Sequence, residues 1–162
     1  MNKQKYFWVN QGKTYKEEKD GGYLWAPYFD KGGNTPHHWQ RMNEITQGDI
    51  IINYDRKRGG VLGYCIAQTS GYSAPQPKEL KNHQEWEGKG VQVDAIYYAL
   101  SRPISLESIY SDIRYLLPSS FSPIQSANRV NQGYLFPINN KIFDFLIKFS
   151  GDKPPLPEEI PN

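Results

Sequence analysis

The sequence has one cysteine, three histidines and little net charge, and each scarcity excludes a class of protein. A single cysteine, Cys65, allows neither an internal disulfide nor a cysteine-rich zinc site. Because it lies in the apolar run GVLGYCIAQ, we expect it to be a small core residue. The 19 basic and 17 acidic side chains leave a formal charge of +2. That charge is too low for a non-specific nucleic-acid coat, although a basic groove on one face remains compatible with it.

Long hydrophobic runs are also missing. No run approaches the roughly 20 apolar residues that a membrane-spanning helix needs. The N-terminal MNKQKYFW lacks the apolar stretch of a signal peptide. We therefore expect a cytoplasmic protein with no membrane partner.

The motifs of common enzymes are absent as well. The sequence contains no HExxH, no GxSxG and no glycine-rich phosphate loop. His37 and His38 are adjacent, so on a helix their side chains would point about 100° apart and would not share a metal ion easily. Asp49 follows a turn glycine, where a capping role is more typical than a general base. We expect no catalytic residues, no metal and no cofactor, and hence a protein that is not an enzyme by itself.

Aromatic residues are plentiful: twelve Tyr, seven Phe and four Trp among 162 residues. Such rings fill β-rich cores, and they also stack on flat ligands. The length predicts one domain at residues 1–150. The tail at residues 151–162 holds four of the twelve prolines and is typical of a linker.

Hydrophobic periodicity predicts the elements. Strands are expected at 5–10, 50–54, 61–68, 91–100 and 131–138, and helices at 35–45, 105–117 and 140–149. The strands at 50–54 and 61–68 should form a hairpin across RKRGG, Pro103 should end the strand before it, and 11–34 and 69–90 should be irregular. Strands and helices do not alternate regularly. The pattern therefore predicts an α+β fold, a small mixed β-barrel of about five or six strands with about three packed helices.

Two similar corners favour a binding pocket. Asn10 and Gln11 precede a glycine at the end of the first strand, and the segment VNQGY repeats the amide–glycine–aromatic pattern at 130–134. Amides can read the edge of a flat ligand, and a glycine lets the backbone approach it. The aromatic stretch GGYLWAPY at 21–28 would supply stacking rings. The alternative is two ordinary turns built from good turn residues.

Several segments, taken in order, resemble a known family. They are YFWVNQ, MNEITQGDIIINY, GGVLGYCIAQTSGYSAP, VDAIYYALSRPISLESI and QGYLFPI. Over about residues 5–149 the chain resembles the EVE domains of the PUA-like superfamily. It is most similar to those fused to HNH nucleases or to McrB-type AAA+ GTPases in modification-dependent restriction systems.

The resemblance implies a reader of 5-methylcytosine or 5-hydroxymethylcytosine in duplex DNA, with the base flipped into an aromatic pocket. It also implies a nuclease or AAA+ GTPase module as partner, in cis or in trans, and a place in antiphage defence. The pocket residues implied are Trp8, Asn10, Trp25, Tyr54, Gln132 and Tyr134. Contacts to the nucleic-acid backbone are expected from Lys13, Arg56, Lys57, Arg58, Tyr72 and Arg129.

Trp25 is the ring expected to stack on the base, and Tyr23 and Tyr28 are expected to pack. Two alternatives stay open. The chain could read RNA or N6-methyladenine, as the related YTH domains do. It could also be a regulatory domain that binds a small molecule or nucleotide.

Overall fold

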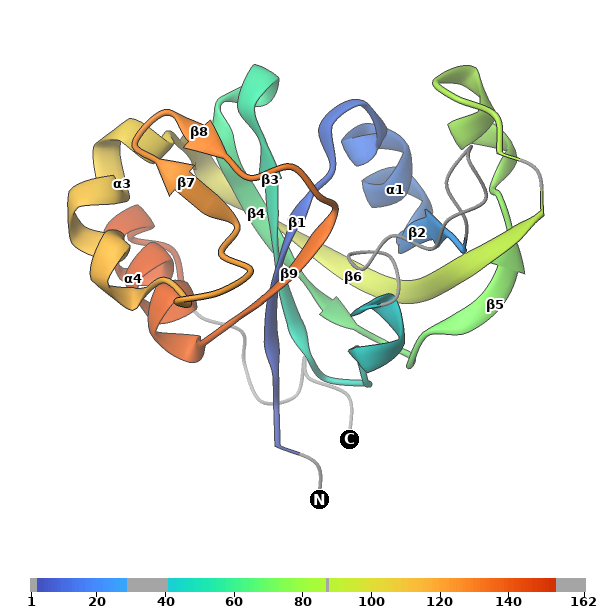
Figure 1. Ribbon diagram of the computed structural model, residues 1–162, viewed down its shortest axis with the longest axis horizontal. Coiled ribbons are helices and arrows are strands. Elements are labelled where there is room, and N and C mark those ends of the chain that lie inside the picture. Colours follow the sequence, from blue (N-terminus) through green and yellow to red (C-terminus); the bar gives the residue numbers. More distant parts are fainter. Residues whose placement is uncertain (1–2, 29–40, 87, 154–162) are drawn as a thin grey trace.

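A curled sheet lies at the centre of the computed structural model, which describes residues 3–28, 41–86 and 88–153 (Figure 1). The sheet has seven strands in the order β2-β6-β4-β3-β1-β9, with β5 pairing with β6. Its strands are β1 (Tyr6–Asn10), β2 (Tyr23–Pro27), β3 (Ile50–Asp55), β4 (Gly60–Ala67), β5 (Tyr72–Pro75), β6 (Lys89–Ile104) and β9 (Leu135–Ile138). A separate two-stranded hairpin is formed by β7 (Ile124–Ser126) and β8 (Arg129–Val130).

Three α-helices accompany the strands in the described residues: α1 (Tyr15–Gly21), α3 (Leu106–Ile113) and α4 (Asn140–Ser150). Short 3₁₀ helices are η1 (Gly12–Thr14), η2 (Arg41–Glu44), η3 (Arg56–Arg58), η4 (Lys78–Asn82) and η5 (Arg114–Leu116). The predicted α+β class is therefore confirmed. No helix among the described residues is long and apolar enough to cross a membrane.

The long strand β6 connects the two ends of the sheet. Its first half pairs with β2 and β5, and its second half pairs with β4. The predicted hairpin is confirmed, since β3 and β4 are antiparallel and joined by η3. The pair β1–β3 is parallel and brings the ends of both strands to the same edge of the sheet.

Both faces of the central strands are buried. One face packs on α3 and α4 through a cluster that includes Trp8, Ile52 and Phe143. The other face carries a second cluster with Phe7, Ile51 and the predicted core residue Cys65. Successive strand residues point to opposite faces, so adjacent apolar positions enter different clusters.

The segment 11–34 is not a loop as far as it is described, and this corrects the sequence-based prediction. It forms η1, then α1, then β2. Gly22 ends α1 in the left-handed region at φ 74°, and Tyr23–Pro27 then pairs antiparallel with β6. GGYLWAPY is therefore mostly a strand. It shows no polar–apolar alternation because both of its faces are covered.

Two further boundaries were wrong. The segment 69–90 contains β5 and η4. Strand β6 does not stop before Pro103 but continues to Ile104. The pairing of β6 with β4 is irregular between the pairs Gly63↔Ala99 and Val61↔Ile104. Pro103 lies in this irregular part of β6, so its lack of a backbone N–H removes no hydrogen bond between the strands.

The last two predicted helices are confirmed, with one exception. Ser105 caps α3 through its Oγ, which accepts from the Ser108 N–H. The helical period of α4 predicts a packed face of Ile142, Phe143, Leu146 and Phe149, and all are buried except Phe149. Phe149 is 48% exposed and stacks on Phe145. Of the predicted helix 35–45, residues 41–44 form η2, and 35–40 lie outside the described residues, as does the tail beyond 153.

Candidate functional site

A cavity of about 320 Å³ lies between η1, β2 and the segment that follows β5. Its volume falls at the lower end of the range for small-ligand sites. Its lining combines two indoles and a phenol with several amides and two basic side chains. The lining residues are Gln11, Lys13, Thr14, Trp25, Ala26, Pro27, Gln76, Leu80, His83, Gln84, Trp86 and Tyr134.

Trp25 forms a rigid wall of this cavity. Its indole lies over Gly90 of β6, where an added Cβ would be 2.6 Å from the ring. Its Nε1 donates to the carbonyl of Ala74 in β5 at 3.1 Å. The side chain thus spans from β2 across β6 to β5, which leaves it only 5% exposed.

Trp86 lies on the irregular segment after η4, and Gln76 holds that segment in place. The Gln76 Oε1 accepts from the Trp86 backbone N–H at 3.0 Å, and its Nε2 donates to the Gln84 carbonyl at 2.7 Å. Gln76 is itself buried. One amide side chain therefore satisfies two backbone groups of a segment that has no regular structure.

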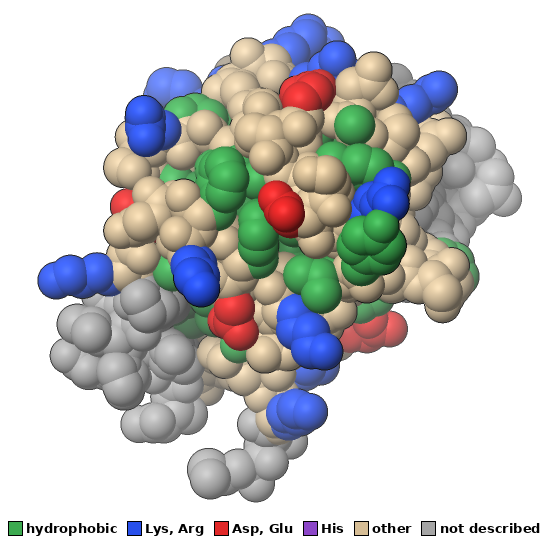
Figure 2. All heavy atoms as spheres, turned by 90° about the vertical axis from the view of Figure 1, so that its left-hand side faces the viewer, with side chains coloured by type: hydrophobic (Ala, Val, Ile, Leu, Met, Phe, Trp, Pro, Cys, Tyr) green, Lys and Arg blue, Asp and Glu red, His purple; other side chains and the backbone are tan. Residues whose placement is uncertain are grey.

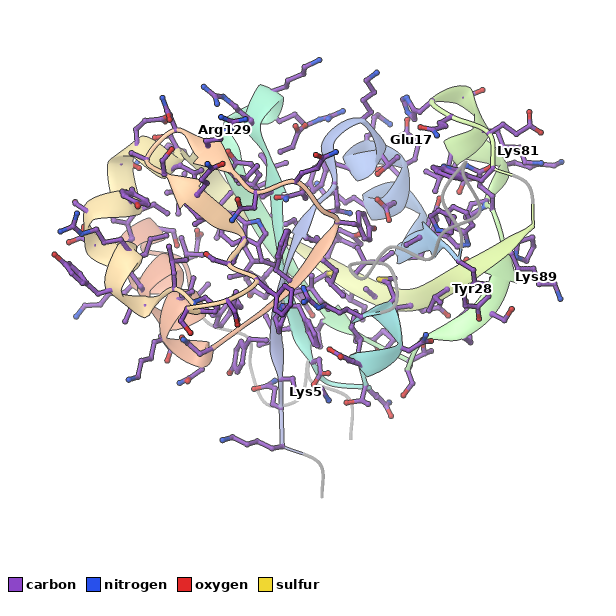
Figure 3. All side chains as sticks on the ribbon, viewed as in Figure 1. Lys5, Glu17, Tyr28, Lys81, Lys89 and Arg129 are labelled. Carbon is purple, nitrogen blue, oxygen red and sulfur yellow. The ribbon has the colours of Figure 1, made fainter. Side chains whose placement is uncertain are left out.

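Two polar links tie η4 and its end to α1 and β2. The Tyr23 hydroxyl donates to Glu79 Oε1 at 2.7 Å, and His83 Nε2 lies 3.1 Å from Glu17 Oε1. Leu80 packs against Tyr23 and Trp25. These contacts hold Leu80 and His83, which line the cavity, against α1 and β2; Glu17 is labelled in Figure 3.

Glu18 lies at the meeting point of three wall segments and is fully buried. Its carboxyl accepts from Thr14 Oγ1 at 2.6 Å, from the Trp25 backbone N–H at 2.9 Å and from the Tyr134 hydroxyl at 2.5 Å. Gln11 Nε2 donates to it at 3.3 Å. Burial raises the pKa of Glu18 to about 7, against the lowering effect of these donors.

Asn10 fixes the second Asn-Gln-Gly corner to the first strand. Its Nδ2 donates to the carbonyls of Asn131 and Gly133 at 3.3 and 3.0 Å. Its backbone N–H donates to the Tyr134 carbonyl at 2.8 Å. The two corners that the sequence singled out are thus neighbours in the structure.

Of the six residues expected in the pocket, Trp25 and Tyr134 line the cavity. Trp8 and Tyr54 lie in the core, 0% and 4% exposed, with their rings stacked at 5.2 Å between centroids. Their rings pack the core in this structure, so a base could reach them only if the sheet opened. Asn10 supports the wall from behind, and Gln132 is exposed outside the lining.

Five of the expected backbone-contacting residues lie along one edge, which we call the basic ridge. It consists of Lys13, Arg56, Lys57, Arg58 and Arg129, all exposed. Arg58 Nη1 donates to the Gly12 carbonyl at 3.1 Å, and Arg56 Nη1 donates to the Asn128 carbonyl, so η3 is tied to both η1 and the β7–β8 turn. Figure 3 labels Arg129 at this edge.

The sixth, Tyr72, does not join the ridge. It begins β5, which lies at the opposite edge of the molecule in Figure 1, and its hydroxyl donates to Asp94 Oδ1 at 2.7 Å.

The face formed around α3 and α4 is different in character. Figure 2 shows hydrophobic side chains there scattered among Lys and Arg. Exposed rings outside the cavity include Tyr115 at 76% and Phe121 at 57%. Neither lines the cavity, so they provide matched aromatic controls for it.

Sequence reasoning missed Glu18, Gln76 and Trp86 as site residues. In the sequence, Glu18 is one of several charged residues in the polar run KEEKD, which is typical of a solvent-exposed segment. Trp86 lies in a long segment predicted to be irregular. Long irregular segments are often functional, so its length was a signal that Trp86 could belong to a site. Nothing in the local sequence marks Gln76, because its role depends on the path of a chain eight to ten residues later.

No protein-family model matches the chain, and no curated protein matches it significantly. Solved structures do. Protein Atu2648 from Agrobacterium tumefaciens superposes with a TM-score of 0.60 at 13% identity, covering 98% of this chain and 99% of that one. Human THYN1, solved in complex with 5-methylcytosine-containing DNA, gives 0.59 at 13% identity, covering 93% and 100%.

The YTH domain of the Zygosaccharomyces rouxii MRB1 protein, solved with N6-methyladenosine RNA, gives a TM-score of 0.57 at 12% identity, covering 93% of this chain and 88% of that domain. At such identities the similarity concerns the fold. The predicted PUA-like fold class is confirmed.

Proposed function

We propose that this chain is a non-catalytic reader of modified bases in nucleic acid. The favoured target is 5-methylcytosine or 5-hydroxymethylcytosine in duplex DNA, captured by flipping the base into the cavity beside Trp25. The observation that carries the proposal is a small cavity walled by Trp25, Trp86 and Tyr134 next to the basic ridge. Two structural neighbours of this chain, THYN1 and the YTH domain, were solved with a methylated nucleic acid.

Stacking supplies the energy for capture. Flipping a base out of a duplex costs a few kcal/mol, and each base–aromatic stack returns roughly 1–3 kcal/mol. Two rings in one cavity therefore suffice to offset the cost. The fixed position of Trp25 over Gly90 means that no ring entropy is lost when the base enters.

The basic ridge would hold the phosphate backbone while the cavity reads the base. Lys13 belongs to both, since it lines the cavity and is part of the ridge. Phosphate contacts fix position without reading sequence. We further propose that this reader directs a nuclease or AAA+ GTPase module, in cis or in trans, as in a modification-dependent restriction system.

The test is binding of the chain to labelled duplexes that differ at one base: cytosine, 5-methylcytosine, 5-hydroxymethylcytosine or N6-methyladenine. We expect at least tenfold tighter binding to one modified cytosine than to cytosine. Trp25→Ala should abolish that preference and leave the salt-dependent, non-specific binding. The matched control Tyr115→Ala, which removes an exposed ring outside the cavity, should change neither. Equal affinity for all four duplexes would refute the proposal.

Reading of N6-methyladenine in RNA is the second candidate, because the YTH domain matches this chain about as well as THYN1 does. A competition between duplex DNA with 5-methylcytosine and single-stranded RNA with N6-methyladenosine separates the two. Preference for the RNA would transfer the proposal from cytosine to adenine.

A further inference from the structure

Gln11 carries an acceptor that the protein leaves unused. The residue lines the cavity and is 5% exposed. Its Oε1 is a buried side-chain oxygen without a hydrogen-bond partner among the described residues. A buried acceptor left unpaired costs free energy, and such atoms in native proteins call for a specific explanation.

The orientation of this amide is fixed by its neighbours. Nε2 of Gln11 donates to the Tyr97 hydroxyl oxygen at 2.9 Å and to Glu18 Oε1 at 3.3 Å. The single hydrogen of that hydroxyl is donated to the Tyr23 carbonyl at 2.7 Å, so toward Gln11 the hydroxyl can only accept. Rotating the amide by 180° would place Oε1 against the Tyr97 hydroxyl oxygen, whose hydrogen is already donated.

Oε1 is therefore the side-chain atom of Gln11 that still lacks a partner, and Gln11 is one of the residues that line the cavity. A base that stacks on an indole of the cavity presents its edge, not its face, to the other lining side chains. Cytosine and adenine carry an exocyclic amino group on that edge, whereas thymine and uracil carry a carbonyl at the equivalent position.

We propose that Gln11 is a specificity-determining residue of the cavity, with its Oε1 accepting a hydrogen bond from the exocyclic amino group of the captured base. The assignment rests on the proposed base-reading function and narrows it to amino-bearing bases. A carbonyl in place of the amino group would face Oε1 acceptor to acceptor. Sites built to bond a polar group reject analogues lacking it far more strongly than apolar pockets reject a methyl group.

The ligand series that tests this uses the unmodified chain. Duplexes carry 5-methylcytosine, 5-methylpyrimidin-2-one or thymine at one site, each opposite guanine. 5-Methylpyrimidin-2-one keeps the methyl group and the ring acceptor but has no group at position 4. We expect at least fivefold weaker binding for it and at least tenfold weaker binding for thymine. Because a mismatched thymine flips more easily, the measured preference against thymine is an underestimate.

A substitution then tests whether Gln11 causes the preference for 5-methylcytosine over thymine. Gln11→Met keeps the side-chain length and removes the amide, and it should reduce the 5-methylcytosine-to-thymine ratio to about twofold or less. Gln47→Met makes the same replacement at an exposed position outside the lining and should keep the full ratio. Urea unfolding of both variants shows whether each is folded under the assay conditions.

The outcomes separate this inference from the proposed function. If the chain prefers 5-methylcytosine to cytosine but binds the three position-4 analogues equally, Gln11 does not read the amino group and base reading stands. The same holds if a folded Gln11→Met variant keeps the full ratio. If the chain does not prefer any modified base, both are overturned. Should Gln11→Met fail to fold, the analogue series alone decides.

Discussion

Replacing Trp86 by alanine tests the cavity with little disturbance of the fold. The side chain is only partly buried, and Gln76 holds the Trp86 backbone through an N–H that the substitution leaves in place. Truncating a fully buried Trp typically costs ~3–5 kcal/mol of stability. We expect a smaller loss here, because part of the indole already faces solvent.

The effect of Trp86→Ala on binding follows from the loss of one base–aromatic stack. One base–aromatic stack contributes roughly 1–3 kcal/mol, and each 1.4 kcal/mol is tenfold in affinity. Trp86→Ala should therefore weaken binding to a duplex with one modified cytosine by roughly 5- to 150-fold. Binding to unmodified duplex, held by the basic ridge, should change less than twofold.

The assay is a fluorescence titration of modified and unmodified duplexes at two salt concentrations. Trp86→Phe keeps a stacking face and should recover part of the lost affinity. Tyr115→Ala is the control for removing an aromatic ring elsewhere. If Trp86→Ala leaves the preference for the modified duplex intact while the variant is folded, the base does not stack on Trp86 in this cavity.

Three other perturbations follow from single contacts. Gly90→Ala would put a Cβ 2.1 Å from the Ala26 carbonyl oxygen and 2.6 Å from the Trp25 ring; we expect about 1–3 kcal/mol lower stability from overpacking, measured by urea unfolding, and loss of the modified-base preference. Gln76→Leu leaves two backbone groups of the Trp86 segment unpaired; limited proteolysis should cut that segment faster, and modified-base affinity should fall at least fivefold. Burial raises the pKa of Glu18 from 4.5 to about 7, so the folded state binds this proton more tightly and the free energy of unfolding should fall as pH rises from about 4.5 to about 7. The fall attributable to this carboxyl is about 3 kcal/mol, and Glu18→Gln should remove most of it.

Each of these has a clear contrary result. An unchanged stability and preference in Gly90→Ala would mean that neither the β2 backbone nor the Trp25 ring is packed against β6 at this position. Unaltered proteolysis in Gln76→Leu would show that the segment needs no amide clamp. Identical pH profiles of the parent chain and Glu18→Gln would mean that this carboxyl keeps an ordinary pKa when buried.

Much of the architecture follows from local signals in the sequence. The β3–β4 hairpin, the capped helix α3 and the amphipathic helix α4 were predicted because their patterns are complete within a few turns or strands. Strand β2 was missed because its evidence is tertiary. Its five residues are buried on both faces, so neither alternation nor a helical period is visible, and its strand state depends on pairing with β6.

The candidate site was predictable in kind but not in detail. Aromatics and amides near the two Asn-Gln-Gly corners indicated a pocket, and those corners do lie together. Which ring lines the cavity depends on what covers each face of each strand. Trp8 faces the cluster beneath α3 and α4, whereas Trp25 faces η4 and the cavity. No local pattern distinguishes the two positions.

The most direct test of the account is the ratio of dissociation constants of this chain for two duplexes that differ only by one 5-methyl group on cytosine, measured at physiological salt. We expect at least tenfold tighter binding to the methylated duplex, or to its hydroxymethyl counterpart, and a clear fall of that ratio in Trp86→Ala. Equal dissociation constants for the unmodified, methylated and hydroxymethylated duplexes would contradict it.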